Sequence, residues 1–144
     1  MEKRETSIIK EIRGNSYKIE KFPAELGAYI AIITTSIGYS LFSGNGEIAL
    51  GSLQKQMGKE EFFEFAKDVL SVVSIKKEAG FFPVYDELGN LRIELQNDSV
   101  VYMCLLIHSL RFNLKNFTEN DGQKCMGEAM AGAMEGLSFF PALG

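Results

Sequence analysis

The only histidine of the chain, His108, follows Cys104 by four residues. In a helix this spacing places both side chains on one face, where a thiol and an imidazole could act as nucleophile and base or bind a metal ion. The apolar run around them disfavours both chemistries, because a nucleophilic cysteine requires an accessible, electropositive environment. The only other soft ligand is Cys125. We interpret Cys104 and His108 as core residues and predict no catalytic residue and no metal site.

A second candidate is a row of carboxylates, Glu60, Glu64 and Asp68, spaced at i, i+4 and i+8. Such a row could bring carboxylates together for acid/base chemistry or for binding a divalent cation. It lies opposite the apolar residues Phe65 and Val69 on the expected helix, which is typical of a solvated face. We therefore favour a solvated face over an active site.

Residues 44–49, Gly-Asn-Gly-Glu-Ile-Ala, match a loose form of the dinucleotide-binding pattern. That pattern requires a preceding parallel strand within a βαβ unit, and the sequence contains no convincing one. We interpret the segment as a simple loop and predict no cofactor.

A row of methionines near the C-terminus, Met126, Met130 and Met134, is the strongest functional candidate. We call these three residues the methionine row. Its chemistry is soft, because methionine is unbranched, polarizable and able to repack against different shapes. Two interpretations stay open: the row closes the core of the domain, or it forms a surface for partner binding or self-association. The residues predicted for that surface are Met126, Met130, Met134, Leu137, Phe139 and Phe140.

Aromatic residues occur as adjacent pairs at 62–63, 81–82 and 139–140. Neighbouring residues of a helix or strand cannot both point into one core. One member of each pair is therefore expected to face a second buried surface, a subunit contact or a partner.

Composition limits the class of protein. A chain of 144 residues with 46% hydrophobic residues suits one soluble domain, and a net charge of -4 disfavours nucleic-acid binding. Two cysteines and a charged opening without a secretory signal favour a reducing cytoplasm. Residues 26–46 carry no charge, but threonine, serine and asparagine interrupt them. We predict a buried helix there and no membrane span.

The expected fold class is α+β and predominantly helical, with four or so helices, short N-terminal and central β-hairpins, and a single domain over 1–144. The first hairpin joins Ser7–Ile12 to residues 16–22 through Gly14-Asn15. A helix follows Pro23 and fades by residue 38 or 42, with Leu26, Ile30, Ile33 and Ile37 facing the core.

The second half of the chain begins with an amphipathic helix over residues 58–73. A second hairpin is expected from residues 82–85 and 91–95, around a turn at 86–90. N-cap oxygens at 97–99 then precede a helix so apolar over 100–107 that it must be central. A polar turn at 116–122 separates it from the methionine-rich helix.

The chain resembles the small tail assembly chaperones of long-tailed bacteriophages and prophages. The resemblance covers most of the chain and lies in the order of elements and in three degenerate motifs. These are Tyr17-Lys18-Ile19-Glu20-Lys21-Phe22-Pro23-Ala24, Glu61-Phe62-Phe63-Glu64-Phe65 and Asn113-Leu114-Lys115-Asn116-Phe117.

This resemblance implies a non-enzymatic chaperone in the host bacterial cytoplasm that binds the tape-measure protein and promotes tail-tube assembly. It also implies a homo-oligomer, with the major tail protein as a further candidate partner. Some members of the family are made alongside a frameshifted, longer product. The alternative is a small oligomeric phage structural or membrane-associated protein, and a small enzyme is less favoured.

The implied client suits the chemistry of the C-terminal segment. A tape-measure protein is a long, largely helical chain with apolar stripes that must stay soluble before tail subunits enclose it. A chaperone for such a client needs an apolar, sequence-tolerant surface and repeated weak contacts. Methionine and small residues meet that requirement.

Overall fold

The computed structural model describes residues 6–37 and 58–118, together with 122, 124, 125, 127–129 and 131. The chain divides into a larger compact unit, Met1–Asn113, and a smaller one, Leu114–Gly144. The described elements include helices and an antiparallel sheet, so the predicted α+β class is confirmed. The single-domain organisation stays a prediction.

The sheet of the larger unit has the strand order β1-β2-β3-β4, and each strand is antiparallel to its neighbour. The strands are β1 (Ser7–Ile12), β2 (Asn15–Glu20), β3 (Val73–Lys77) and β4 (Gly80–Pro83). The named helices are α1 (Ala24–Ile37), α3 (Lys59–Leu70) and α4 (Ser99–Thr118). Among the helices of the described residues, none combines the length and hydropathy needed to cross a bilayer.

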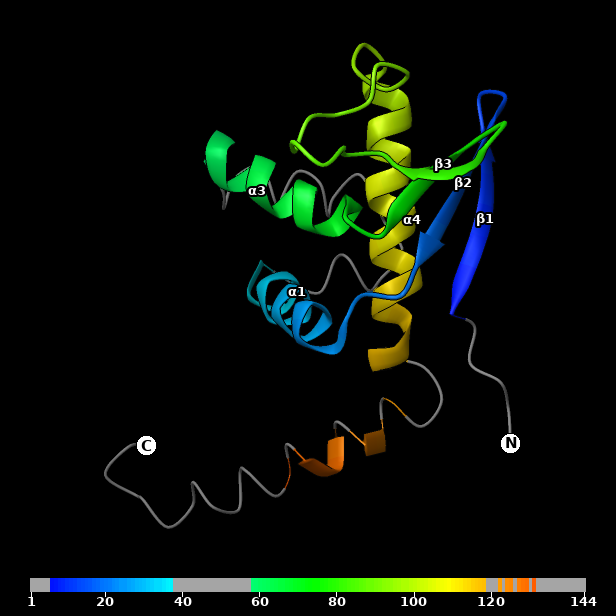
Figure 1. Cartoon of the computed structure of the whole chain (residues 1–144). Helices are drawn as coiled ribbons and strands as arrows, with labels where there is room; N and C mark the ends of the chain where they lie inside the picture. The colour runs from blue at the N-terminus through cyan, green and yellow to red at the C-terminus, as the bar shows by residue number, and fades with distance from the viewer. Residues whose placement is uncertain are drawn as a thin grey trace. The chain divides into compact units, whose positions relative to one another are not determined.

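Helix α4 runs between the sheet on one side and α1 and α3 on the other (Figure 1). Its residues Leu105, Leu106 and Leu110 are buried. A helix that contacts layers on two sides must be apolar over most of its circumference. The central position predicted for this helix is therefore confirmed.

A two-residue turn joins β1 to β2. Ile12 is the Cα partner of Asn15, so the turn consists of Arg13 and Gly14, whose φ angles are 49° and 85°. Two successive positive φ angles are typical of the type I′ turns that match the twist of a hairpin. The predicted hairpin is confirmed, although its turn lies one residue earlier than expected.

Only one face of the sheet packs against α4. Tyr17, Ile19, Val73 and Ile75 alternate along β2 and β3 and are all buried. The opposite face is polar or partly exposed. On that face the Lys18 ammonium lies 4.9 Å from the centre of the Phe81 ring on β4. This alternation is typical of an antiparallel sheet with one solvated face.

The boundary between α3 and β3 corrects the sequence analysis. The predicted helix continued to Val73, but α3 ends at Leu70 and Val73 begins a strand. Ser71 closes the helix, since its hydroxyl donates a hydrogen bond to the Asp68 carbonyl at 2.6 Å. The β-branched residues that follow then pair with β2.

The second hairpin forms with different strands from those predicted. It joins β3 to β4 through Glu78 and Ala79, and Gly80, the first residue of β4, has a φ of 126°. The expected return strand over residues 91–95 is wrong, because that segment forms only an isolated bridge between Tyr85 and Leu91. Leu95 donates its N–H to the carbonyl of Arg92 at 3.0 Å, so the chain bends there instead of extending.

Helix α1 starts where the sequence predicts. Gly27 donates its N–H to the Pro23 carbonyl at 2.8 Å, which places the proline at the start of the helix. Ile30 is fully buried, as expected, and Thr34 is buried with its hydroxyl bonded to the Ala31 carbonyl at 3.0 Å. A buried hydroxyl is tolerated because this bond satisfies it.

Two polar residues of α4 connect the layers. The Ser109 hydroxyl donates to the Val69 carbonyl at the end of α3, at 2.8 Å. The side-chain amide nitrogen of Asn113 donates to the carbonyls of Glu20 and Ser109, at 3.2 and 3.1 Å. Its oxygen accepts the N–H of Phe22. Asn113 therefore attaches the chain between β2 and α1 to the central helix.

Candidate interaction surfaces

The predicted site at the C-terminus lies outside the described residues. This applies to all six of its members, Met126, Met130, Met134, Leu137, Phe139 and Phe140, and also to the loop over 44–49. Described neighbours of the methionine row, at 124, 125, 127–129 and 131, have helical backbone. The role assigned to the methionine row stays a prediction.

The thiol and imidazole candidates lie on α4 and are half-buried. Burial lowers the pKa of His108 below its ordinary value, and the positive charges of Lys10 and Arg111 lower it further. His108 is therefore held in its neutral form more firmly than a free imidazole. Within the described part of the chain, no group of three or more His, Cys, Asp or Glu residues is placed to hold a metal ion.

The carboxylate row on α3 faces solvent over most of its length. Glu60 and Glu64 are exposed and Asp68 is half-buried, while Phe65 and Val69 on the other face are buried. This distribution is that of an amphipathic helix with a solvated acidic face.

Exposed apolar side chains occur on the helical side of α4. On α1, Tyr29 and Ile32 are 54% and 70% exposed, and on α3 Phe63 is 51% exposed. We call these three the helical-side residues, because α1 and α3 both lie across α4 from the sheet (Figure 1). Phe62, beside Phe63, is half-buried. The two members of this aromatic pair therefore do not both point into one core, as the sequence predicts.

The loop between β4 and α4, residues 84–98, is held by hydrogen bonds and carries further exposed apolar residues. One carboxylate oxygen of Asp86 accepts the N–H groups of Leu88 and Asn90, both at 2.9 Å, which fixes the turn. Leu88 at its tip is 86% exposed, and Ile93 further along is 77% exposed. A large apolar side chain held so far into solvent is a candidate for contact with a partner.

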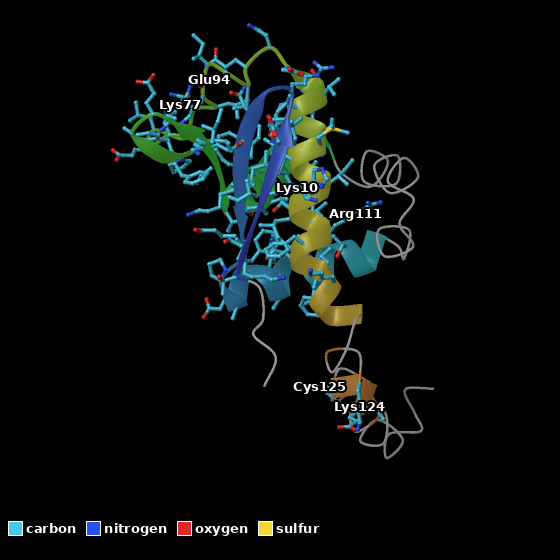
Figure 2. The ribbon with its side chains drawn as sticks, turned by 90° about the vertical axis from the view of Figure 1, so that its right-hand side faces the viewer. Lys10, Lys77, Glu94, Arg111, Lys124 and Cys125 are labelled. Atoms are coloured by element: carbon cyan, nitrogen blue, oxygen red, sulfur yellow. The ribbon has the colours of Figure 1, made fainter. Side chains whose placement is uncertain are left out.

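Three contacts hold this loop to the rest of the larger unit. The hydroxyl oxygens of Tyr85 and Tyr102 lie 2.9 Å apart, and burial together with this hydrogen bond raises the pKa of Tyr102. The side-chain Nε of Arg92 donates to the Pro83 carbonyl at the end of β4. Lys77 on β3 forms an ion pair with Glu94 and lowers the pKa of that carboxyl (Figure 2).

An open cavity of about 530 Å³ lies along the loop. Its lining is mostly polar and mixed in charge, so it suits a polar or charged group better than an apolar one. The lining residues are Asp86, Asn90, Leu91, Arg92, Ile93, Glu94 and Gln96.

The sequence analysis missed the exposed residues Ile9, Leu88 and Ile93. A signal was present for Ile9, because it follows Ile8 in a strand and adjacent strand residues point to opposite faces. Leu88 offered a weaker signal, as an apolar residue inside a polar turn. The exposure of Ile93 had no such signal, since it depends on the bends that replace the expected strand.

Comparisons with models of known protein families, with curated proteins and with solved structures found no match for this chain. The assignment to the tail assembly chaperones therefore stays a prediction from the sequence motifs. The surfaces described above are the structural observations that bear on function.

Proposed function

We propose that this protein is a tail assembly chaperone of a long-tailed bacteriophage or prophage, which binds the tape-measure protein and promotes tail-tube assembly. The resemblance of the sequence motifs supplies the client and the process. One structural observation supports the proposal: the exposed helical-side residues Tyr29, Ile32 and Phe63.

These residues suit a helical client. Tyr29 and Ile32 are three residues apart on α1, so they lie on the same face of that helix. An amphipathic helix binds such a surface by inserting apolar side chains spaced three or four residues apart. Full burial of a side chain the size of isoleucine contributes about 1.5–3 kcal/mol, so a few such contacts give weak, reversible binding.

Weak binding suits a chaperone that subunits of the tail tube must displace. The proposed homo-oligomer strengthens the binding, because several copies on one long client act with avidity. The methionine row from Met126 to Met134 is the proposed second contact, for self-association or for the client. The proposed location is the host bacterial cytoplasm, with the major tail protein as a further partner and no enzymatic activity.

Co-expression with a tape-measure protein from the same phage or prophage genome tests the proposal. The wild-type chain is expected to keep that protein soluble and to co-purify with it. The double variant Ile32→Glu, Phe63→Glu is expected to lower the recovered client at least tenfold, because it places charges on the apolar contact.

Val100→Glu is the matched control, since Val100 is 51% exposed but lies at the start of α4. It is expected to leave recovery of the client unchanged. A wild-type chain that interacts with no tail component would rule out the proposal. Partition into membranes when expressed alone would instead favour a membrane-associated protein.

A further inference from the structure

The two outer strands of the sheet differ in how their free edges are protected. On β4, Pro83 has no backbone N–H and cannot donate a hydrogen bond to a further strand. Proline is commonly found at sheet edges for this reason. Arg92 also covers the end of this strand, because its side chain donates to the Pro83 carbonyl and its backbone N–H bonds to the carbonyl of Val84, the next residue. The β4 edge is therefore closed to a further strand.

The edge of β1 is open among the described residues. Lys21 donates its N–H to the Thr6 carbonyl at 3.1 Å, which fixes the hydrogen-bonded positions of the β1–β2 ladder at even-numbered residues of β1. The N–H and C=O groups of Ser7, Ile9 and Glu11 consequently point away from β2. No described residue forms a hydrogen bond with these groups.

The side chains along the β1 edge determine which kind of strand can pair with it. Ile9 lies on the solvated face of the sheet and is 55% exposed. Lys10 points to the other face, since its Cα partner is the buried Tyr17. Lys10 on β1 and Arg111 on α4 both lie close enough to the imidazole of His108 to lower its pKa, so two positively charged side chains lie on this side of the edge (Figure 2).

A second copy of β1 fits this edge poorly. Antiparallel pairing about a twofold axis at Ile9 would place Lys10 diagonally across from its own copy, near the positive charge of Arg111. A strand that carries an acidic side chain opposite Lys10 meets a complementary charge instead. Directly opposed residues at a position without hydrogen bonds have their Cα atoms about 4.5 Å apart, so that contact is close.

We propose that the open edge of β1 binds an extended segment of a partner protein, which adds a fifth strand to the sheet. The backbone groups of Ser7, Ile9 and Glu11 pair with the segment. An acidic side chain of the segment lies opposite Lys10, and an apolar side chain covers Ile9. This site lies on the far side of α4 from the helical-side residues and does not depend on the proposed function.

A synthetic peptide provides the probe: Val-Thr-Val-Glu-Val-Thr-Val with blocked ends, which reads the same in both directions. NMR titration of the full-length chain is expected to shift the amide signals of Ser7, Ile9 and Glu11 and to slow their hydrogen exchange. The amides of the even-numbered β1 residues already bond to β2 and are expected to change less. A peptide with lysine in place of glutamate is expected to bind about fivefold more weakly.

Two variants test the hydrogen bonds and the charge separately. Ile9→Pro removes an N–H that faces the open edge and no bond to β2, so it is expected to weaken binding of the glutamate peptide. Lys10→Glu is expected to reverse the preference between the two peptides. It also keeps the proposal testable if the proline variant does not fold.

Three outcomes would overturn the proposal. The first is equal affinity for both peptides, and the second is binding that shifts signals elsewhere on the chain. The third is a concentration-dependent dimer whose contact involves the same β1 amides without peptide, which would make a second copy the occupant.

Discussion

The side-chain oxygen of Asn113 accepts the backbone N–H of Phe22 at 2.6 Å, between residues 91 positions apart in the sequence. Asn113 is buried, with 6% of its surface exposed, and its amide nitrogen satisfies two backbone carbonyls as well. The Asn113 side chain thus connects the end of β2 and the segment before α1 to the central helix α4. Buried polar groups with all partners present stabilise and specify a fold in this way.

Replacement of this residue is expected to be costly. Asn113→Leu leaves the Phe22 N–H and the Glu20 carbonyl without a partner, and we expect the free energy of unfolding to fall by about 3 kcal/mol. Urea denaturation measures this change. Asn97→Leu, at an exposed position, is the control and is expected to change stability by less than about 0.5 kcal/mol. Equal effects of the two substitutions would contradict the assigned role.

His108 makes stability depend on pH. Its folded pKa lies below the ordinary value of 6.5, so between these two values the unfolded chain binds the proton more readily. The free energy of unfolding is therefore expected to fall as pH drops below 6.5 and to level off below the folded pKa. His108→Gln is expected to remove this part of the pH dependence.

The lowered pKa of His108 can be measured directly by NMR, because the chain has only one histidine. Lys10→Gln removes a nearby positive charge and is expected to raise the pKa read from the imidazole proton signal. Lys59→Gln, on another element, is expected to leave that pKa unchanged. If Lys10→Gln has no effect either, the positive charge beside His108 has been misassigned.

Asp98 caps α4 and pairs with the turn of the first hairpin. Its carboxylate accepts the Val101 N–H at 3.1 Å and bonds to the Arg13 guanidinium, and both lower its pKa below 3.8. Because the folded pKa is depressed, the stabilisation is present above pH 3.8 and is lost as pH falls through the folded value. We expect melting temperatures in the order wild type, Asp98→Asn, Asp98→Ala, since asparagine keeps the cap but not the charge.

Circular dichroism at pH 7 measures this order. The difference between the wild type and Asp98→Asn is expected to shrink as pH falls through the folded pKa of Asp98, because the carboxyl then becomes protonated. The exposed substitution Glu87→Gln is expected to leave the melting temperature unchanged at pH 7. A difference between wild type and Asp98→Asn that stays constant as pH is lowered from 7 would exclude the charge as its cause.

The turn that presents Leu88 depends on one carboxylate. Asp86→Ala removes the acceptor for the Leu88 and Asn90 N–H groups, and hydrogen exchange at these amides is expected to accelerate about fivefold. Asp86→Asn keeps an oxygen in place and is expected to retain most of the protection. Loss of protection throughout the domain would show that Asp86 supports more than its turn.

Local sequence patterns predicted most elements of this fold. The N-terminal hairpin follows from β-branched alternation around a glycine turn, and α1 and α4 follow from apolar periodicity and capping residues. Each of these signals lies within about twenty neighbouring residues.

The errors occur where distant contacts decide the structure. Val73 continues the helical periodicity of α3, but this segment is a strand because it pairs with β2, where Val73 lies opposite Ile19, and with β4. Residues 91–95 alternate like a strand, yet burial of Leu95 and the ion pair of Glu94 with Lys77 accompany a series of bends. For the candidate site, the sequence indicated the methionine row but not the exposed apolar residues held by these bends.

The place of α4 in the chain determines when the protein can fold during its synthesis. This helix supplies the middle of the larger unit but begins only at Ser99. Until the ribosome has released it, the apolar faces of the first hairpin and of α3 have no shared core to bury them. Contacts between distant parts of a chain also form slowly. We therefore expect the sheet and the helices of the larger unit to acquire their packing together, only after α4 has left the ribosome.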